Sequence, residues 1–329
     1  MNFVTKSIGR SLARGIASIF AASLVVAGAH AADFPERQIR IIVPYTAGGP
    51  TDAVIREMAP VAAGFLNGHQ PLVDNKPGGG TVIGSQILHT AAPDGYTIGV
   101  INDQLTTNEL LLSNIPYKYT DFDFIIGTTY QSIAIVVRSE VPASNLDETL
   151  AWLKDKGSSL SYGTWGPGSQ AQLAGERLGE LMGVKFVHVP FAGSGPAAVA
   201  LLGGHLDFAL LDVASVFQHV KSGKLKILAV TTVGRPAVLP NVPRLADKFP
   251  GFDMFTWNAL AVPKGTPPAR IQALADGLRK TLQDPKIVKS FNDRGITIWP
   301  LNSKEVTDRL QQDYRNAKEI IEKRGIRLE

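Results

Sequence analysis

Short apolar runs alternate with helical stretches bounded by glycine or proline along most of the chain. The β-branched run at 38–43 ends at Pro44, which predicts a buried strand. Pro50 stands where a helix would begin, a position at which its missing N–H costs nothing. Further strands are predicted at 71–74, 96–101, 132–139, 159–163, 186–189, 206–211, 225–231 and 258–262, and further helices at 81–91, 146–156, 169–182, 268–282 and 303–323. Alternation of this kind is typical of an α/β fold with a mostly parallel sheet.

The chain is near the length at which one hydrophobic core gives way to two. No low-complexity linker separates independent modules, so we expect two interleaved lobes. The strong strand at 132–139 marks a predicted crossing into the second lobe, and 258–262 marks the return. The expected division is 1–31 as a signal peptide, 32–131 plus 256–329 as lobe 1, and 132–255 as lobe 2.

The first residues have the pattern of an export signal. Lys6, Arg10 and Arg14 form a basic segment, followed by an apolar run at 15–27 and a small-x-small motif that ends at Ala31. A membrane anchor is the alternative, but the run is shorter than the ~20 apolar residues that span a bilayer. We therefore expect cleavage near Ala31 and a soluble protein in the periplasm.

Composition removes several classes of function. The chain has no cysteine, which excludes a lipid anchor, cysteine catalysis and thiolate metal sites. Its 33 basic residues, less the three in the predicted signal peptide, leave 30 against 29 acidic ones. So small a net charge is no footprint for nucleic acid, and nucleic acid is not an expected partner.

Two segments, 43–50 and 189–196, repeat one motif: Val-Pro-aromatic at the start and Gly-Pro at the end, with identical spacing. Each follows an apolar strand and precedes a helix, so each should place a helix N-terminus at the C-terminal edge of its sheet, where ligands of open α/β sheets bind. Free N–H groups and the helix dipole favour an anion there. Neither segment contains a basic residue. The glycine turns at 166–170 and 78–81 could contribute as well.

Enzyme readings find little support. The segment 166–171 matches the G-x-G-x-x-A dinucleotide fingerprint, but no acidic residue ends the strand after its helix. The histidines are dispersed without ligand spacing, so we expect no metal and no cofactor. Asp52 and Asp212 fall at predicted helix starts, where capping is the expected role. Ser169 and Ser194 lack a nearby base and are interpreted as hydrogen-bond donors.

The same residues carry a family resemblance over almost the whole chain after the signal peptide. The matching segments are 43–52, 75–80, 93–97, 166–169, 173–176, 188–191, 201–207, 262–267 and 284–285. They resemble the periplasmic binding components of tripartite tricarboxylate transporters, the TctC or Bug family. The resemblance implies an α/β fold of the periplasmic binding protein type (type II, Venus flytrap), with two α/β lobes around a ligand cleft. It also implies a carboxylate held by backbone amides, hydroxyls and ordered waters.

Carried over by position, the resemblance gives a set of ligand-binding residues. The first wall is Tyr45, Ala47, Gly48, Gly49, Thr51 and Asp52; the second is Gly168, Ser169, Gln170, Phe191 and Gly193, with Asp212 and Ser215; Thr106 and Asn108 come from a loop after the 96–101 strand. Trp165 stands where the family usually has a small residue, and Thr46 where it usually has proline. An aromatic wall at Trp165 would suit an aromatic carboxylate; the alternative is that Trp165 packs on the lobe surface.

The expected function is capture of a small carboxylate, either a di- or tricarboxylate or an aromatic one. The ligand would pass to the integral membrane permease subunits of a tripartite tricarboxylate-type transporter. We expect a monomer and no enzyme activity. A sensor that presents the ligand to a membrane kinase and a periplasmic hydrolase remain the alternatives.

Overall fold

The computed structural model describes residues 34–232 and 234–327, so the predicted signal peptide and its cleavage near Ala31 lie outside the described residues. The strands are β1 (Arg40–Val43), β2 (Leu72–Asn75), β3 (Thr97–Ile101), β4 (Phe122–Arg138), β5 (Ser161–Thr164), β6 (Val187–Pro190), β7 (Phe208–Asp212), β8 (Leu225–Val230), β9 (Phe255–Pro263) and β10 (Ile296–Ile298). The α-helices are α2 (Pro50–Ala63), α3 (Val82–His89), α4 (Gln104–Leu111), α5 (Leu146–Lys156), α6 (Gln170–Met182), α7 (Ser194–Leu202), α8 (Val213–Lys221), α9 (Pro268–Leu282), α10 (Pro285–Asp293) and α11 (Ser303–Arg324).

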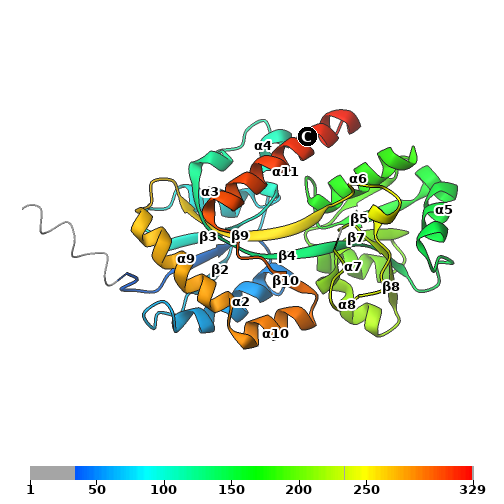
Figure 1. The fold of residues 1–329 in the computed structure, drawn as a ribbon. Helices are drawn as coiled ribbons and strands as arrows, with labels where there is room; N and C mark the ends of the chain where they lie inside the picture. The colour runs from blue at the N-terminus through cyan, green and yellow to red at the C-terminus, as the bar shows by residue number, and fades with distance from the viewer. Residues whose placement is uncertain (1–33, 233, 328–329) are drawn as a thin grey trace, which may run out of the picture.

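One mixed sheet runs through the described residues, in the order β2-β1-β3-β9-β4-β7-β5-β6, with β8 and β10 also paired to β4. The outer strands are parallel, as the alternating pattern predicts: β1 with β2 and β3, and β5 with β6 and β7. The two central strands, β4 and β9, are antiparallel to each other and to their neighbours. Figure 1 shows both strands running from one half of the molecule into the other.

Each half has its own hydrophobic core. In the first half, Ile41, Val54 and Leu278 belong to a buried cluster between the sheet and helices α2 and α9. In the second half, buried clusters lie on both faces of the sheet, around Phe208 on one face and Leu211 on the other. The predicted lobe boundaries fall within β4 and at the start of β9, the strands that the halves share; the division itself remains a proposal.

Helix α11 lies across both halves (Figure 1). Val306 and Leu310 pack into a cluster of the first half, whereas Ile320 packs with Leu173 of α6 in the second. Near its C-terminus, Arg324 Nε donates to Glu176 Oε2 at 2.9 Å. The prediction that this helix returns to the first lobe is therefore incomplete, because its apolar stripe continues beyond that lobe onto α6.

The sequence placed Thr106 and Asn108 in a loop, and this prediction is wrong: both lie in α4. The polar residues of α4 point inward, so Thr106, Thr107 and Asn108 are all buried. An inward polar face removes the apolar periodicity by which an amphipathic helix is recognised. The first half of β4 and helix α10 were also not predicted.

We predict that Gly127→Ala destabilises the protein. A Cβ at this position in β4 would lie 2.7 Å from the backbone oxygen of Trp299 and 2.9 Å from Leu301 Cβ. Since backbone must move to admit it, the free energy of unfolding should fall by about 1–3 kcal/mol in urea denaturation. Gly64→Ala is the control, because its Cβ would meet no atom closer than 3.5 Å. Equal effects of the two substitutions would contradict this account.

Candidate functional site

A small cavity, of about 60 Å³, lies between the two halves of the molecule. Its lining residues are Tyr45, Gly49, Pro50, Thr51 and Asn102 from the first half, Trp165, Ser194 and Asp212 from the second, and Gln131, Thr256 and Asn258 from β4 and β9. A space of about 280 Å³ shares Tyr45 and Trp165 with it, and another of about 290 Å³ shares Gly49 and Pro50. The three spaces therefore adjoin, and we call the smallest the central cavity.

Two helices begin at the central cavity without a side-chain cap. Gly49 is the N-cap of α2 and Gly193 is the N-cap of α7, and neither helix has a capping side-chain hydrogen bond. Side chains cap α5, α6, α8, α10 and α11. Helices α3, α4 and α9 also lack such a cap, but among the uncapped α-helices of the described ranges only α2 and α7 have first-turn residues that line the central cavity. The first N–H groups of an α-helix have no partner within the helix, and its dipole is positive at that end. Two such ends, one from each half, favour an anion between them.

The repeated motif does not start its two helices at the same place. Helix α2 begins at Pro50, as predicted, whereas α7 begins at Ser194, two residues before the matching Pro196. Gly193 adopts φ of 135°, a conformation that favours glycine and lets the chain turn into the helix early. The free backbone donors on the second wall therefore include Ser194 and Gly195.

The Asp52 carboxylate holds the first turn together. It accepts hydrogen bonds from the Gly48 N–H at 2.8 Å, from Arg56 Nε at 2.9 Å and from Asn75 Nδ2 at 2.8 Å. Burial acts to raise the pKa of Asp52, but these hydrogen bonds and the Arg56 charge bring the pKa below its ordinary value of 3.8. The expected capping role of Asp52 is wrong, because the N-cap of α2 is Gly49 and the Asp52 carboxylate bonds to the Gly48 N–H that precedes it. Asp52 thus shapes the wall, and its contact with a ligand stays a prediction.

Asp212 caps helix α8, as expected from the sequence. Its carboxylate accepts from the Ser215 N–H at 2.9 Å and from Ser194 Oγ at 2.6 Å, which ties the start of α7 to the start of α8. Burial raises the pKa of Asp212 above its ordinary value of 3.8. Ser194 is accordingly a donor to a carboxylate. Contact of Asp212 or Ser215 with a ligand stays a prediction.

Aromatic side chains line the space on one side of the central cavity. The Tyr45 hydroxyl donates to Gln104 Oε1 at 3.0 Å and accepts from Asn102 Nδ2. Burial and the nearby Asp103 charge raise the pKa of Tyr45, so its hydroxyl stays neutral. Trp165 lines the central cavity and, with Phe191, the 280 Å³ space.

Thr106, Asn108, Gly168, Ser169 and Gln170 lie beside the cavities, where the two halves meet. Asn108 Nδ2 donates to the Gly80 carbonyl at 2.8 Å, and Ser169 caps α6 by accepting from the Gln172 N–H. A Cβ at Gly168 would lie 3.0 Å from Leu111 Cδ1 of α4, so the turn before α6 rests directly on that helix. None of these five residues is among those that line the three spaces, and their contact with a ligand stays a prediction.

The remaining residues of the predicted set belong to the turns around the cavities. Gly48 and Ser215 line the 290 Å³ space, while Ala47 is an exposed residue of the first turn. The sequence analysis missed Asn102, Gln131, Thr256, Asn258 and Arg294. Local patterns gave no usable signal for Gln131 and Asn258, because Gln131 belongs to a polar stretch of β4 and Asn258 is a single polar residue between apolar ones in β9. Arg294 pairs with Glu57 and comes from outside the repeated motif.

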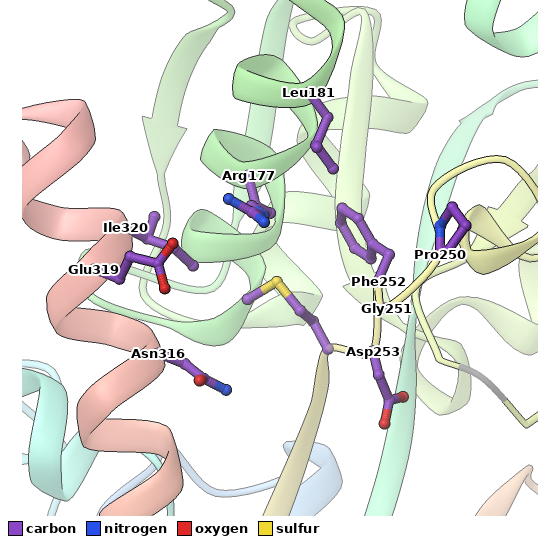
Figure 2. A pocket seen from close by; sticks show the side chains of 10 residues that line it. Arg177, Leu181, Pro250, Gly251, Phe252, Asp253, Asn316, Glu319 and Ile320 are labelled. Carbon is purple, nitrogen blue, oxygen red and sulfur yellow. The ribbon is translucent and has the colours of Figure 1, made fainter.

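Figure 2 shows a separate cavity, of about 270 Å³, between α6, α11 and the segment 250–254. Arg177 on its wall pairs with Glu180 at 2.6 Å, and Glu319 pairs with Lys323 at 2.8 Å. Because its arginine is already paired, this cavity has fewer groups available to bind an anion than the central cavity, where two uncapped helices begin. Within 34–232 and 234–327, no group of three His, Asp or Glu side chains is placed to hold a metal ion. None of the helices in these ranges is both long and apolar enough to cross a membrane.

The fold and the anion-favouring cavity between its halves are those of a solute-binding receptor. The comparison with known families gives the same class. The family model described as the tripartite tricarboxylate transporter family receptor, TctC, matches residues 54–326, and the chain belongs to this family. The relative BugD, whose structure is known, is a periplasmic binding protein.

Individual relatives match over nearly their whole length. The chain is 32% identical over 322 residues to the UPF0065 protein in the gbd 5′ region of Cupriavidus necator, covering 95% of this chain and 96% of that one. The structure of the periplasmic binding protein BugD is 30% identical, with a TM-score of 0.82, and the match covers 89% of this chain and 99% of BugD. MatC from Rhodopseudomonas palustris with bound malate is 25% identical, with a TM-score of 0.78 and coverage of 88% and 100%.

We predict that Asp52→Asn destabilises the fold in a pH-dependent way. Loss of the charged acceptor should lower the free energy of unfolding by about 1–3 kcal/mol at neutral pH. Because the pKa is lowered in the folded state, this stabilisation is complete above the unfolded value, about 3.9, and is lost as the pH falls through the folded pKa. Urea denaturation at neutral pH and near pH 3 should therefore show a smaller difference in acid. Exposed Asp155→Asn is the control, with an effect within about 0.5 kcal/mol.

Proposed function

We propose that this protein captures a small carboxylate in the periplasm and delivers it to the integral membrane permease subunits of a tripartite tricarboxylate-type transporter. The observation that carries the proposal is the pair of uncapped helix N-termini, α2 and α7, at one cavity. A carboxylate placed there accepts hydrogen bonds from first-turn N–H groups of both helices. Its binding thereby links the two halves and favours their closed arrangement.

The surroundings support binding rather than turnover. The residues that line the central cavity include no histidine, and the carboxylate to which the Ser194 hydroxyl donates is the one that caps α8. Arg56 is paired with Asp52, and Arg294 with Glu57, so the charge of a ligand would be met mainly by backbone dipoles. The malate bound to MatC supports a dicarboxylate, and the Trp165 ring supports including aromatic acids among the ligands tested. We expect the receptor to act as a monomer.

The proposal predicts that at least one carboxylate stabilises the protein. Residues 32–329 would be purified and refolded free of bound ligand, then screened by thermal shift against L-malate, succinate, citrate, L-glutamate and benzoate. A ligand that binds only the folded state stabilises it by RT ln(1 + L/Kd), where L is the ligand concentration, so Tm rises as the ligand concentration is raised above Kd. No rise in Tm with any of these acids would contradict the proposal.

A substitution at Gly195 tests the backbone donors directly. A Cβ at Gly195 would meet no atom within 4 Å, so side chains fit there. We expect Gly195→Asp to place its own carboxylate at the start of α7, which should raise Kd at least about tenfold while stabilising the empty protein by about 0.3–1 kcal/mol. Gly195→Asn, the uncharged control of the same shape, should change Kd less than about threefold. Calorimetric titration measures Kd, and equal effects of Asp and Asn would count against an anion at this position.

A further inference from the structure

The two strands that cross between the halves present polar atoms to the central cavity without partners. Gln131 of β4 and Asn258 of β9 are each 3% exposed. Among the described residues, the side-chain oxygens Gln131 Oε1 and Asn258 Oδ1 are buried and accept no hydrogen bond. The hydroxyl oxygen of Thr129 on β4 is unpartnered in the same way.

The strand register gathers these atoms on one face of the sheet. Thr129 lies opposite Asn258, and Gln131 lies opposite Thr256. Side chains of directly opposed residues point to the same face, and residues two apart on one strand share that face too. Gln131, Thr256 and Asn258 all line the central cavity, so this face forms its floor.

Leaving a buried polar atom unpaired costs about 1–3 kcal/mol, and native proteins keep few such atoms. Because Gln131 and Asn258 line the central cavity, the partner that their amides lack would enter from it. The atoms without partners are oxygens, which require a donor. A carboxylate oxygen only accepts, whereas a hydroxyl group both donates and accepts, as does an amide side chain.

An ammonium group is the other common hydrogen-bond donor, but the carboxylate that would balance its charge already accepts hydrogen bonds from the protein. The Asp212 carboxylate, which lines the same cavity, accepts from Ser194 Oγ and from the Ser215 N–H. The floor itself is neutral, since Gln131, Asn258 and Thr256 carry no charge. A neutral hydroxyl therefore fits it better than a cation.

We propose that Gln131 and Asn258 determine specificity by binding a hydroxyl group of the ligand, so that the receptor selects hydroxycarboxylates over the matching deoxy acids. The hydroxyl donates its single proton to the side-chain oxygen of one amide and accepts from the NH2 group of the other. This inference rests on the proposed function, in which the carboxylate lies at the N-termini of α2 and α7. The backbone donors on the walls then bind the charge, and the amides on the floor select the hydroxyl.

The test compares acids that differ by one hydroxyl group. Calorimetric titration of the wild-type protein with L-malate and succinate, and with citrate and tricarballylate, should show at least about tenfold tighter binding of the hydroxylated member of the pair that binds. In Gln131→Met and in Asn258→Leu this ratio should fall toward one, while Kd for the deoxy acid changes less than about threefold. Exposed Gln38→Met is the matched control and should keep the wild-type ratio.

A second measurement separates recognition from a structural role. Replacing an unpaired buried amide by an apolar side chain of similar size removes an unmet hydrogen-bonding requirement. The ligand-free Gln131→Met protein should therefore melt at the same temperature as the wild type or higher. A lower Tm, with both acids of a pair weakened equally, would mean that the amide holds only an ordered water, and would overturn the inference.

The two proposals fail in distinguishable ways. If the wild type binds malate and succinate equally well, specificity for the hydroxyl is wrong and capture of a carboxylate stands. If no carboxylate binds the wild type, both proposals are wrong.

Discussion

The pairing of β4 with β9 is the constraint on which the rest of the molecule depends. Its register runs from Phe122 opposite Pro263 to Ser132 opposite Phe255. Beyond that point, β4 continues into the second half, where it pairs with β7 and β8. Because β4 and β9 are hydrogen-bonded to each other along this length, they join the two halves of the molecule into one sheet. The floor of the central cavity therefore belongs to the sheet, whereas its walls belong to turns and helix ends.

The walls of the central cavity offer hydrogen-bond donors because the helices that begin there lack a capping side chain. Glycine at the N-cap of α2 and of α7 supplies no capping side chain, so the first backbone N–H groups of each helix remain available. Elsewhere in the same lobes, Asn145 and Ser169 cap their helices. Helices α3, α4 and α9 are uncapped too, so what distinguishes α2 and α7 is an uncapped end whose first turn lines the central cavity. The Ser194–Asp212 bond then fixes one of the open ends in place.

Sequence reasoning recovered the walls because their signal is local. Strand, glycine turn and proline lie within eight residues in the 43–50 segment, and the start of α2 at Pro50 follows from them. The bounds of α5 and α9 were predicted for the same reason, since each has a clear apolar period. Local signals also explain the family resemblance, which the comparison with known families confirms.

The floor could not be predicted from local patterns. Gln131 and Asn258 are distant in the sequence and meet only because β4 and β9 pair, in a register that contains two irregularities. Until the partner strand is placed, Gln131 is one of several polar residues in the middle of β4, and Asn258 is a single polar residue among apolar ones in β9. Helix α4 was not predicted for a related reason. Its buried face is polar, so its sequence lacks the apolar period by which a helix is recognised.

The residues that line the central cavity include no arginine, and the desolvation cost of a buried guanidinium explains why. A guanidinium enclosed in a small cavity must give up its hydration, and an uncompensated buried charge destabilises strongly. Arg56 and Arg294 avoid this by pairing with Asp52 and Glu57. Helix ends and amides carry only partial charges, so closing the cleft around them costs far less than burying a full charge. If the protein closes on a carboxylate, as proposed, such groups suit it, because the ligand then brings into the cavity a full charge that the protein has not already paired.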